Sequence, residues 1–220
     1  MNRPILITLK ILAWVICLLP LARLAYGVVN PAVLGADPIA KVELATGHAT
    51  LLLLTVGLGI TPVRRLSPRL GWMIKFRRLL GLFAFFYGTI HMLAWVVLYT
   101  GLNVNVMIED IAKRRFITMG MAAWLLLLPL ALTSTNWAIR KLGGKRWNRL
   151  HKLVYLAVVC GVIHYWWQVK PGVFLPLPFT IAVALLLSVR PVQSWLLRRK
   201  ARAAIVQPAR PTATGAGQGV

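Results

Sequence analysis

The histidines are the residues in this sequence that point most clearly to chemistry. His151 and His164 lie near the two ends of the apolar stretch 147–170, and His91 lies in another apolar stretch. An imidazole at membrane depth is energetically costly and usually has a function, and a neutral imidazole is a common metal ligand. The sequence therefore suggests a metal or haem site inside a membrane protein.

His91 and His164 are expected at similar depth in the membrane. The apolar helices at about 79–99 and 150–169 both begin at a cluster of basic residues, so they run in the same direction. At a rise of about 1.5 Å per residue, His91 lies roughly 12 Å and His164 roughly 8 Å from the ends opposite those clusters. Two imidazoles on different helices at this depth suit the ligation of one haem from both sides. The alternative is a structural hydrogen bond between helices.

His151 is expected near the other side of the membrane, roughly 20 Å from His164 along the helix axis. That distance suits two haems, or one haem and another electron carrier, across one membrane. The two side chains point about 140° apart, so they need not face the same helix. No other histidine is expected on that side. A second haem there needs a different ligand, an open coordination position or a ligand from another subunit, and the alternative is an interfacial histidine among basic neighbours.

His48 and Arg23 are candidates for secondary contacts with a haem. His48 is expected in the same half of the membrane as His91 and His164. There it either competes with His91 as the partner of His164 or donates a hydrogen bond to a haem propionate. Arg23, in the outer part of the first apolar segment, is a second candidate for a propionate. Snorkelling of its guanidinium to the nearby interface is the simpler account.

Six hydrophobic segments must position these residues. They lie at about 9–29, 44–62, 79–99, 116–133, 150–169 and 173–189, and a helix of about 20 residues crosses a hydrocarbon layer of roughly 30 Å. The chain has 220 residues, of which 59% are hydrophobic, and a mean hydropathy of +0.72, too apolar for an ordinary soluble domain. The predicted fold is an all-α polytopic membrane protein, a six-transmembrane-helix bundle forming one domain over 1–200. A disordered tail is expected at 201–220.

Charge predicts the orientation of the bundle. The chain has 26 Lys and Arg against four acids, a net charge of +22. Three basic clusters lie between the second and third segments, between the fourth and fifth, and after the sixth, all on the side of the N-terminus. One smaller basic group, Lys113, Arg114 and Arg115, lies on the opposite side and weakens the pattern locally without reversing it. The positive-inside rule then makes both termini cytoplasmic. Because the clusters lie between apolar segments, they favour membrane topology over nucleic-acid binding.

Other kinds of chemistry find less support. Cys17 and Cys160 lie inside apolar segments, and neither a CxxC nor a CxxCH motif occurs, which disfavours iron–sulfur clusters and covalently attached haem. Four acids leave little for a proton relay and disfavour an ion pump. On the outer side, the loop at 101–115, with Glu109 and Asp110, is a candidate docking site for a partner.

The sequence also resembles a known family. The resemblance rests on four stretches that together span most of residues 46–170: TGHATLLLLTVGLGITPVRR, RRLLGLFAFFYGTIHMLAWVVLY, ITMGMAAWLLLLPLALTSTNW and KRWNRLHKLVYLAVVCGVIHYWWQVK. In order and spacing they resemble the haem-binding membrane subunits of periplasmic methionine sulfoxide reductase systems, in the ferric reductase-like transmembrane family. In the wider family, two helices each carry two histidines nearly four turns apart. His151 and His164 fit this pattern, whereas Arg77 and Arg78 stand where the partner of His91 is expected.

The resemblance implies a protein of the bacterial inner membrane, in contact with membrane lipid, that binds one or two b-type haems through His91, His164 and His151. It also implies FMN as an additional cofactor. Electrons would come from the quinol pool or a cytoplasmic flavin reductase. They would pass to a periplasmic molybdopterin enzyme that reduces methionine sulfoxide in oxidised periplasmic proteins, so this chain would be an electron-transfer subunit and not the catalytic one.

Two alternatives remain open at the level of the sequence. A ferric or quinone reductase of the same broad fold is expected to carry a flavin and nicotinamide domain, for which the short basic tail leaves no room. The other is a non-haem membrane scaffold or small transporter with structural histidines, which would purify without colour.

Overall fold

The computed structural model describes residues 3–206, and every regular element in them is a helix. Six helical segments are long and apolar enough to cross a membrane, which confirms the predicted all-α, six-helix architecture. Their main helices are α1 (Arg3–Val29), α2 (Pro38–Arg64), α3 (Arg77–Ala94), α5 (Arg115–Leu132), α8 (Leu153–Gln168) and α9 (Leu177–Val206). A 3₁₀ segment at Pro68–Phe76 precedes α3, and a π-helical turn at Trp95–Tyr99 follows it.

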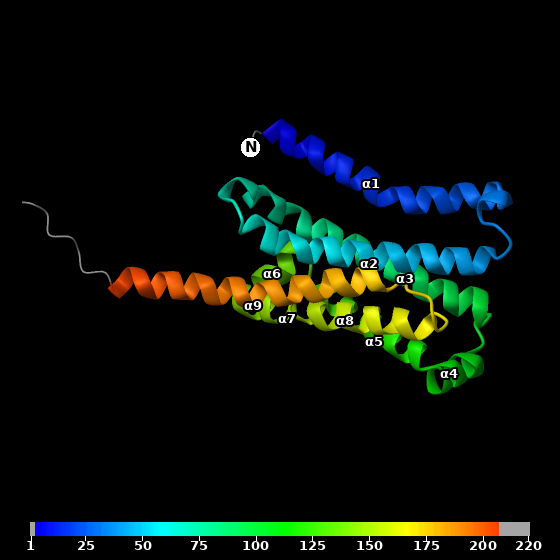
Figure 1. The fold of residues 1–220 in the computed structure, drawn as a ribbon. Coiled ribbons are helices and arrows are strands. Elements are labelled where there is room, and N and C mark those ends of the chain that lie inside the picture. Colours follow the sequence, from blue (N-terminus) through cyan, green and yellow to red (C-terminus); the bar gives the residue numbers. More distant parts are fainter. Residues whose placement is uncertain (1–2, 207–220) are drawn as a thin grey trace, which may run out of the picture.

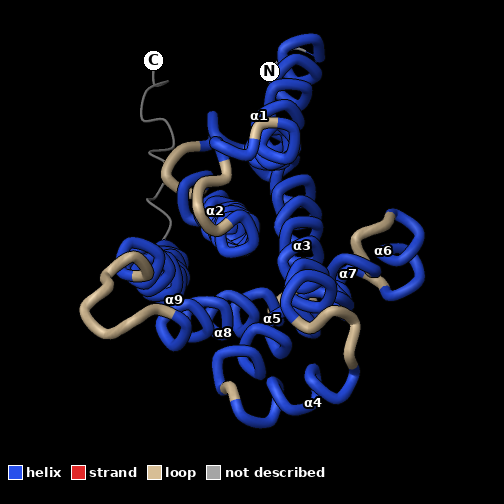
Figure 2. Tube along the Cα trace, turned by 90° about the vertical axis from the view of Figure 1, so that its right-hand side faces the viewer, coloured by secondary structure: helices blue, strands red, loops and turns tan. Residues whose placement is uncertain are grey.

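Two helix pairs form the body of the bundle (Figures 1 and 2). Helix α2 packs along α3, and α5 packs along α8. Helix α3 also contacts α5, and α9 lies against α2 and α8. Buried apolar side chains fill the space between these helices, among them Leu51, Leu54, Leu58, Leu127 and Val158. The pairs therefore meet around the main core, and a smaller buried cluster lies between α1, α2 and α3.

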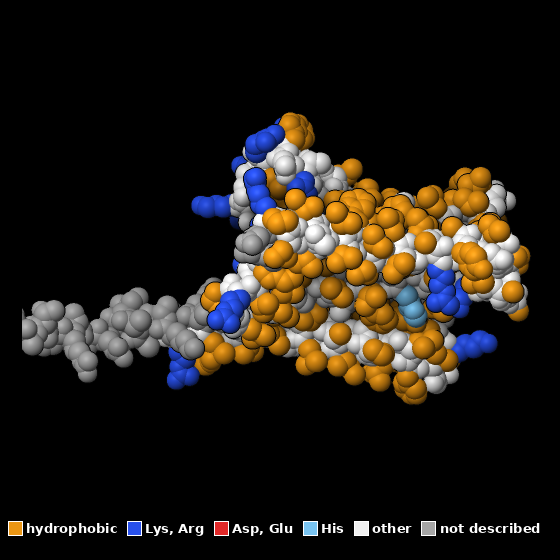
Figure 3. All heavy atoms as spheres, turned by 90° about the horizontal axis from the view of Figure 1, so that it is seen from above, with side chains coloured by type: hydrophobic (Ala, Val, Ile, Leu, Met, Phe, Trp, Pro, Cys, Tyr) orange, Lys and Arg blue, Asp and Glu red, His pale blue; other side chains and the backbone are white. Residues whose placement is uncertain are grey.

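The surface of the bundle is apolar between two charged ends. Figure 3 shows hydrophobic side chains across the middle of the molecule and Lys and Arg side chains gathered at both ends. One end carries the short helices α6 (Asn136–Leu142) and α7 (Gly144–Leu150), and the other carries α4 (Val104–Lys113). We call them the α6–α7 end and the α4 end. Helix α1 starts and α9 finishes toward the α6–α7 end (Figure 1), which is the arrangement expected for termini on one side of a membrane.

Helix α1 lies outside the two pairs and contacts α3 through the ring pair Trp14–Phe83 and through the hydrogen bonds of Tyr87. Pro20 has no N–H and interrupts the hydrogen-bond ladder of α1. The hydroxyl of Tyr87, a fully buried residue of α3, accepts a hydrogen bond from Leu21 N (3.2 Å) and donates one to Cys17 O (2.6 Å). An uninterrupted helix pairs these two backbone groups with each other. Tyr87 thus satisfies them where the bilayer offers no water.

Three short helices lie where loops or a continuous helix were predicted. Residues 101–115 contain the amphipathic helix α4, whose first turn is capped by the Asn103 side chain. Helices α6 and α7 meet at Gly143, which has a φ of +72° that glycine adopts at little cost. His151, expected in the first turn of the fifth helix, lies in the turn between α7 and α8. These elements are shorter than three turns, so hydrophobic periodicity gives them little signal.

The last helix also differs from its predicted range. Gly172, with a φ of +86°, and Pro176 lie in the connection before α9, which begins at Leu177 and not near 173. Helix α9 continues to Val206, so the tail predicted at 201–220 begins inside a helix. Residues 207–220 lie outside the described part of the chain.

Candidate functional site

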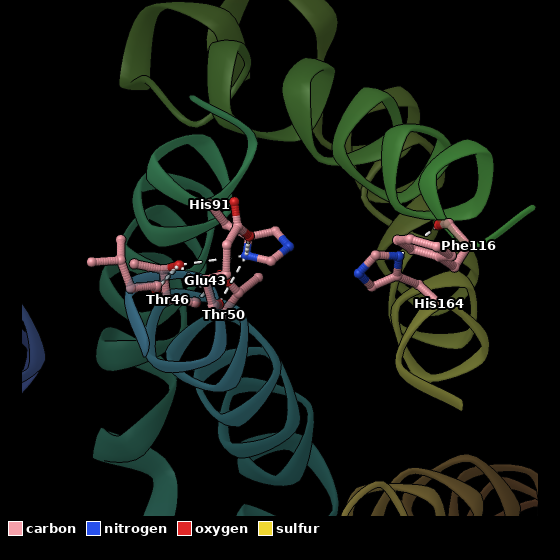
Figure 4. Close-up of polar contacts among 7 residues, drawn as sticks. Glu43, Thr46, Thr50, His91, Phe116 and His164 are labelled. Atoms are coloured by element: carbon pink, nitrogen blue, oxygen red, sulfur yellow. Dashed lines mark hydrogen bonds and ion pairs between the residues drawn. The ribbon is translucent and has the colours of Figure 1, made fainter. Parts of the chain in front are cut away.

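The imidazoles of His91 and His164 face each other across the bundle. His91 comes from α3 and His164 from α8, and their ring centroids are 5.8 Å apart with the ring planes at 86°. Figure 4 shows each ring directing its Nε2 side toward the other. Metal–imidazole bonds are about 2 Å long, so this separation suits two imidazoles on opposite sides of one metal atom. The two residues that the sequence placed at similar depth are thus brought together.

His91 is oriented by Glu43 of α2. Its Nδ1 lies 2.7 Å from Glu43 Oε2 and 3.0 Å from the Glu43 backbone oxygen. Both are acceptors, so Nδ1 carries the proton and donates it, which leaves the lone pair of Nε2 free. A Cβ at Gly47 would lie 3.3 Å from the His91 ring, so a small residue at this position lets the ring pack against α2.

His164 is oriented by a backbone carbonyl of α5. Its Nδ1 donates to Phe116 O at 2.6 Å, which again leaves Nε2 as the free nitrogen. A Cβ at Gly120 would lie 2.7 Å from His164 Nδ1, closer than two such atoms can approach. Glycine at this position therefore lets α5 and the His164 ring come together. An acceptor on the second nitrogen is the usual device that fixes the orientation of a metal-binding histidine.

The two rings project into a cavity with a mostly apolar lining. The part of this space that water-sized molecules can occupy is about 90 Å³, within about 720 Å³ of empty space that includes open solvent. Four glycines leave its wall without side chains: Gly47, Gly88, Gly120 and Gly161. Trp124 closes one side, stacks on Phe85 of α3 at 5.9 Å and donates from Nε1 to Thr89 Oγ1 at 3.1 Å. We call this space, between α2, α3, α5 and α8, the histidine cavity.

The mouth of the histidine cavity lies at the α4 end and carries polar side chains. Asp110 of α4 accepts a hydrogen bond from Trp95 Nε1 at 3.3 Å and pairs with Arg114 Nε at 3.0 Å. All three residues line the space next to His91 and His164. The segment predicted as a docking loop is therefore a helix tied to the cavity mouth through Asp110.

His48 lies in the wall of the histidine cavity but is not the ring that faces His164. It hydrogen-bonds through Nε2 to the hydroxyl of Tyr165. Its other side borders a cleft between α1 and α2 that Arg23 and Lys41 also line. His48 therefore connects the cavity with the cleft that holds Arg23.

A second cavity lies at the α6–α7 end around His151. Its basic lining residues are Arg64, Arg77 and Arg78, and we call it the arginine cavity. The His151 ring stacks on Trp147 at 3.8 Å, and its Nε2 lies 3.2 Å from Thr133 Oγ1. Among the described residues that line this cavity, His151 is the only histidine.

A thin apolar layer separates the two cavities. Leu54 of α2 and Leu127 of α5 line both of them, and each is 5% exposed. Both belong to the main core. One layer of leucine side chains therefore stands between the histidine cavity and the arginine cavity.

Comparisons with known proteins show the family of this chain. A model of the family described as "Ferric reductase like transmembrane component" matches residues 42–162, a region that contains His48, His91 and His151 and ends just before His164. A relative from Herminiimonas arsenicoxydans is 44% identical over 199 residues, which is 90% of each chain. The chain belongs to the ferric reductase-like transmembrane family, in its MsrQ branch.

The relative from Herminiimonas arsenicoxydans is described as "Protein-methionine-sulfoxide reductase heme-binding subunit MsrQ". Further relatives carry the same description. One from Ralstonia nicotianae is 48% identical over 160 residues, 72% of each chain. Another from Bordetella pertussis is 44% identical over 195 residues, covering 88% of this chain and 93% of the relative. As a member of the ferric reductase-like family with six apolar helices and bacterial relatives, the chain is a multi-pass protein of the bacterial inner membrane.

Glu43 is the residue of this site that sequence reasoning missed. In the sequence Glu43 lies near the start of the second hydrophobic segment, and acids are almost never fully buried unless they are paired. The structure buries it to 8% exposure against His91. The available signal was spacing along α2, because Glu43, Gly47 and Thr50 recur at helical intervals and all line the cavity.

Proposed function

We propose that this chain is the haem-binding membrane subunit of a methionine sulfoxide reductase system and that His91 and His164 ligate one b-type haem. The observation that carries the proposal is the pair of facing imidazoles, 5.8 Å apart, each with its Nδ1 already bound to an acceptor. The relatives support it, since they are described as heme-binding subunits of protein-methionine-sulfoxide reductase.

The residues of the histidine cavity fit such a group. Within residues 3–206, no cluster of three or more His, Cys, Asp or Glu side chains could hold a metal ion. A metal between His91 and His164 therefore takes its remaining ligands from a cofactor. A bound haem supplies a one-electron carrier whose potential depends on its axial ligands and surroundings. Around it the chain provides apolar side chains and four glycines, one from each of the helices α2, α3, α5 and α8.

His48 and Arg23 are proposed to make secondary contacts with the haem. His48 lies in the cavity wall, and the cleft behind it holds two cations, Arg23 and Lys41. Cationic and hydrogen-bonding side chains suit carboxylates such as the haem propionates. His48 is also held by Tyr165, so we expect its loss to alter the haem spectrum without abolishing binding.

The arginine cavity is proposed to be where electrons enter. Its three guanidinium groups suit an anionic carrier, because arginine pairs with phosphates and carboxylates in bidentate geometry. Two carriers fit this description: FMN, held through its phosphate, and a second b-type haem with His151 as its only histidine ligand. In either case His151, held in place by Trp147 and Thr133, lies nearest to the donor.

On this proposal the chain carries electrons outward across the inner membrane. The donor is the quinol pool or a cytoplasmic flavin reductase. The acceptor is a periplasmic molybdopterin enzyme that reduces methionine sulfoxide in oxidised proteins. Both termini then lie in the cytoplasm, with the α6–α7 end inside and the α4 end outside.

The test is the reduced-minus-oxidised spectrum of the purified protein, with haem quantified as the pyridine haemochrome. Wild type is expected to show b-type bands that His91→Ala and His164→Ala abolish. His151→Ala should alter electron input or the content of a second carrier while the bands from the histidine cavity persist. The ratio of haem to protein decides between one haem and two, and a flavin assay on the same sample decides on FMN.

Two outcomes would overturn the proposal. Colourless protein from haem-replete cells would make the histidines structural, and the chain a scaffold or small transporter. Haem that persists unchanged in both His91→Ala and His164→Ala would place the ligands elsewhere.

A further inference from the structure

Glu43 is a buried acid beside one of the two facing histidines. It is 8% exposed, lies one turn into α2 and faces the histidine cavity. Burying a carboxylate costs several kcal/mol unless the charge is paired. Among residues 3–206, the one ion-pair partner of Glu43 is His91, at 2.7 Å. Its second oxygen, Oε1, is buried without a hydrogen-bond partner.

Helix packing alone gives no reason for this arrangement. Helices α2 and α3 already pack closely along their length through apolar residues, including Ala49, Phe83 and Tyr87. An apolar residue at position 43 would serve the same contact without a desolvation cost. The backbone oxygen of residue 43 would still accept a hydrogen bond from His91 Nδ1, at 3.0 Å. The carboxylate therefore adds something besides orientation.

What it adds is an asymmetry between the two facing imidazoles. His164 Nδ1 donates to a neutral carbonyl, that of Phe116, whereas His91 Nδ1 donates to a carboxylate (Figure 4). A charged acceptor makes a stronger hydrogen bond and raises the electron density of the ring, and with it the basicity of Nε2. A more basic ligand and a nearby negative charge both favour the more positive oxidation state of a metal.

We propose that Glu43 is a positioning residue that acts through His91 to lower the reduction potential of the metal held between His91 and His164. This inference rests on the proposed haem ligation. Glu43, acting on His91, makes the reduced carrier a stronger electron donor. The backbone oxygen of Phe116 only holds His164 in place.

The experiment is a redox titration of the full-length purified protein, followed by the optical spectrum, for wild type, Glu43→Gln and Glu43→Asp. Glutamine has nearly the same shape, accepts a hydrogen bond and carries no charge, so haem content should stay near that of wild type. We expect its reduction equilibrium to shift about tenfold or more toward the reduced form, which is about 59 mV for a one-electron couple. Glu43→Asp keeps the charge and should stay closer to wild type.

Glu109→Gln is the matched control, because it removes an exposed carboxylate on α4 that pairs with Lys113. Its potential should equal that of wild type. A Glu43→Gln protein with full haem content and an unchanged potential would refute the inference and leave the proposed function intact. Loss of haem in both Glu43 variants would also refute it, since the side chain would then serve only to hold the site together. A wild-type protein without haem would instead refute the proposed function.

Discussion

At the scale of single residues, the candidate site depends on how closely backbone and side chains approach the two rings. Both rings lie against helices that carry glycine at the point of contact, Gly47 for His91 and Gly120 for His164. The contact at Gly120 is the tighter one, at 2.7 Å from an added Cβ to His164 Nδ1. The position therefore tolerates no side chain while the ring stays in place.

Gly120→Ala should displace the His164 ring and lower haem content at least tenfold. The reason is that the new methyl group occupies space now filled by the imidazole, and the bond from Nδ1 to Phe116 O is lost with the shift. Haem content per protein, from the pyridine haemochrome, measures the effect. Gly71→Ala, in the 3₁₀ segment before α3, is the control, because an added Cβ there meets nothing within 4 Å. Wild-type haem content in Gly120→Ala would contradict the prediction.

The sequence predicted that His91 and His164 lie at similar depth, but it did not predict that Glu43 contacts His91. Depth along a helix follows from the rise per residue, which placed both histidines near the same side of the membrane. The sequence left open whether His48 or His91 faces His164, since the rotation of α2 and α3 about their axes depends on packing. The burial of Glu43 also depends on packing, because a carboxylate near a helix start is exposed in most proteins.

At the scale of elements, one side chain of α3 holds α1 at the point where Pro20 interrupts its ladder. The Tyr87 hydroxyl bonds both Leu21 N and Cys17 O next to Pro20, and no other side-chain hydrogen bond described for residues 3–206 joins α1 to another helix. The removal of one hydroxyl should therefore loosen a whole helix.

Tyr87→Phe should lower the free energy of unfolding by about 1–3 kcal/mol, because it removes the hydrogen bonds of the Tyr87 hydroxyl to Leu21 N and Cys17 O. Thermal unfolding in detergent, with cleavage of α1 by added protease as a second readout, measures the loss. Tyr26→Phe in α1 is the control, since that side chain is 60% exposed. Equal stability and equal cleavage in Tyr87→Phe would show that α1 is held by other contacts.

On helix α4, the neighbouring acids Glu109 and Asp110 have different partners. Glu109 is exposed and pairs with Lys113 at 2.5 Å. The hydrogen bond from Lys113 lowers the pKa of Glu109. Asp110 instead binds Trp95 and Arg114. Asp110→Asn should therefore detach α4 from the cavity mouth, and Glu109→Gln should not. Protease cleavage within 101–115 measures this difference.

Electron delivery to an outer partner tests the same helix as a docking surface. Glu109→Gln should slow delivery mainly at low salt, since an exposed charge acts on association and is screened by ions. The pKa of Glu109 is lowered in the folded protein, so this carboxylate stays charged down to a lower pH than a free one. Rates that stay unchanged in both Glu109→Gln and Asp110→Asn would remove α4 as a docking surface.

At the scale of the whole molecule, the bundle has two ends of different character, each with its own cavity. The sequence predicted the six crossings because each is a long apolar run, and hydrophobicity is readable without knowledge of packing. It did not predict α4, α6 or α7, because short amphipathic helices at an end lack such a signal. The two cavities could not be predicted from the sequence, because each is lined by residues from several helices that are far apart along the chain.

Reporter fusions test the orientation of the bundle. A reporter active only outside the inner membrane should be inactive when joined before α1 or after α9 and active when inserted in the connection 170–176. The basis is the positive-inside rule, applied to the basic residues near the α6–α7 end. The reverse pattern of activity would invert the molecule and exchange the roles of the two cavities.

The leucine layer formed by Leu54 and Leu127 has a consequence for the energetics of the cell. An unpaired charge is costly to bury in an apolar layer, so such a layer opposes the passage of protons and hydrated ions, whereas an electron can tunnel through it. In the proposed orientation an electron passing from the arginine cavity to the histidine cavity carries negative charge away from a negative interior. The membrane voltage assists that step by up to about 2.3 kcal/mol per 100 mV for a charge that crosses the whole field. Export of reducing equivalents through this bundle would thus draw on the same voltage that drives cellular work, without leaking protons.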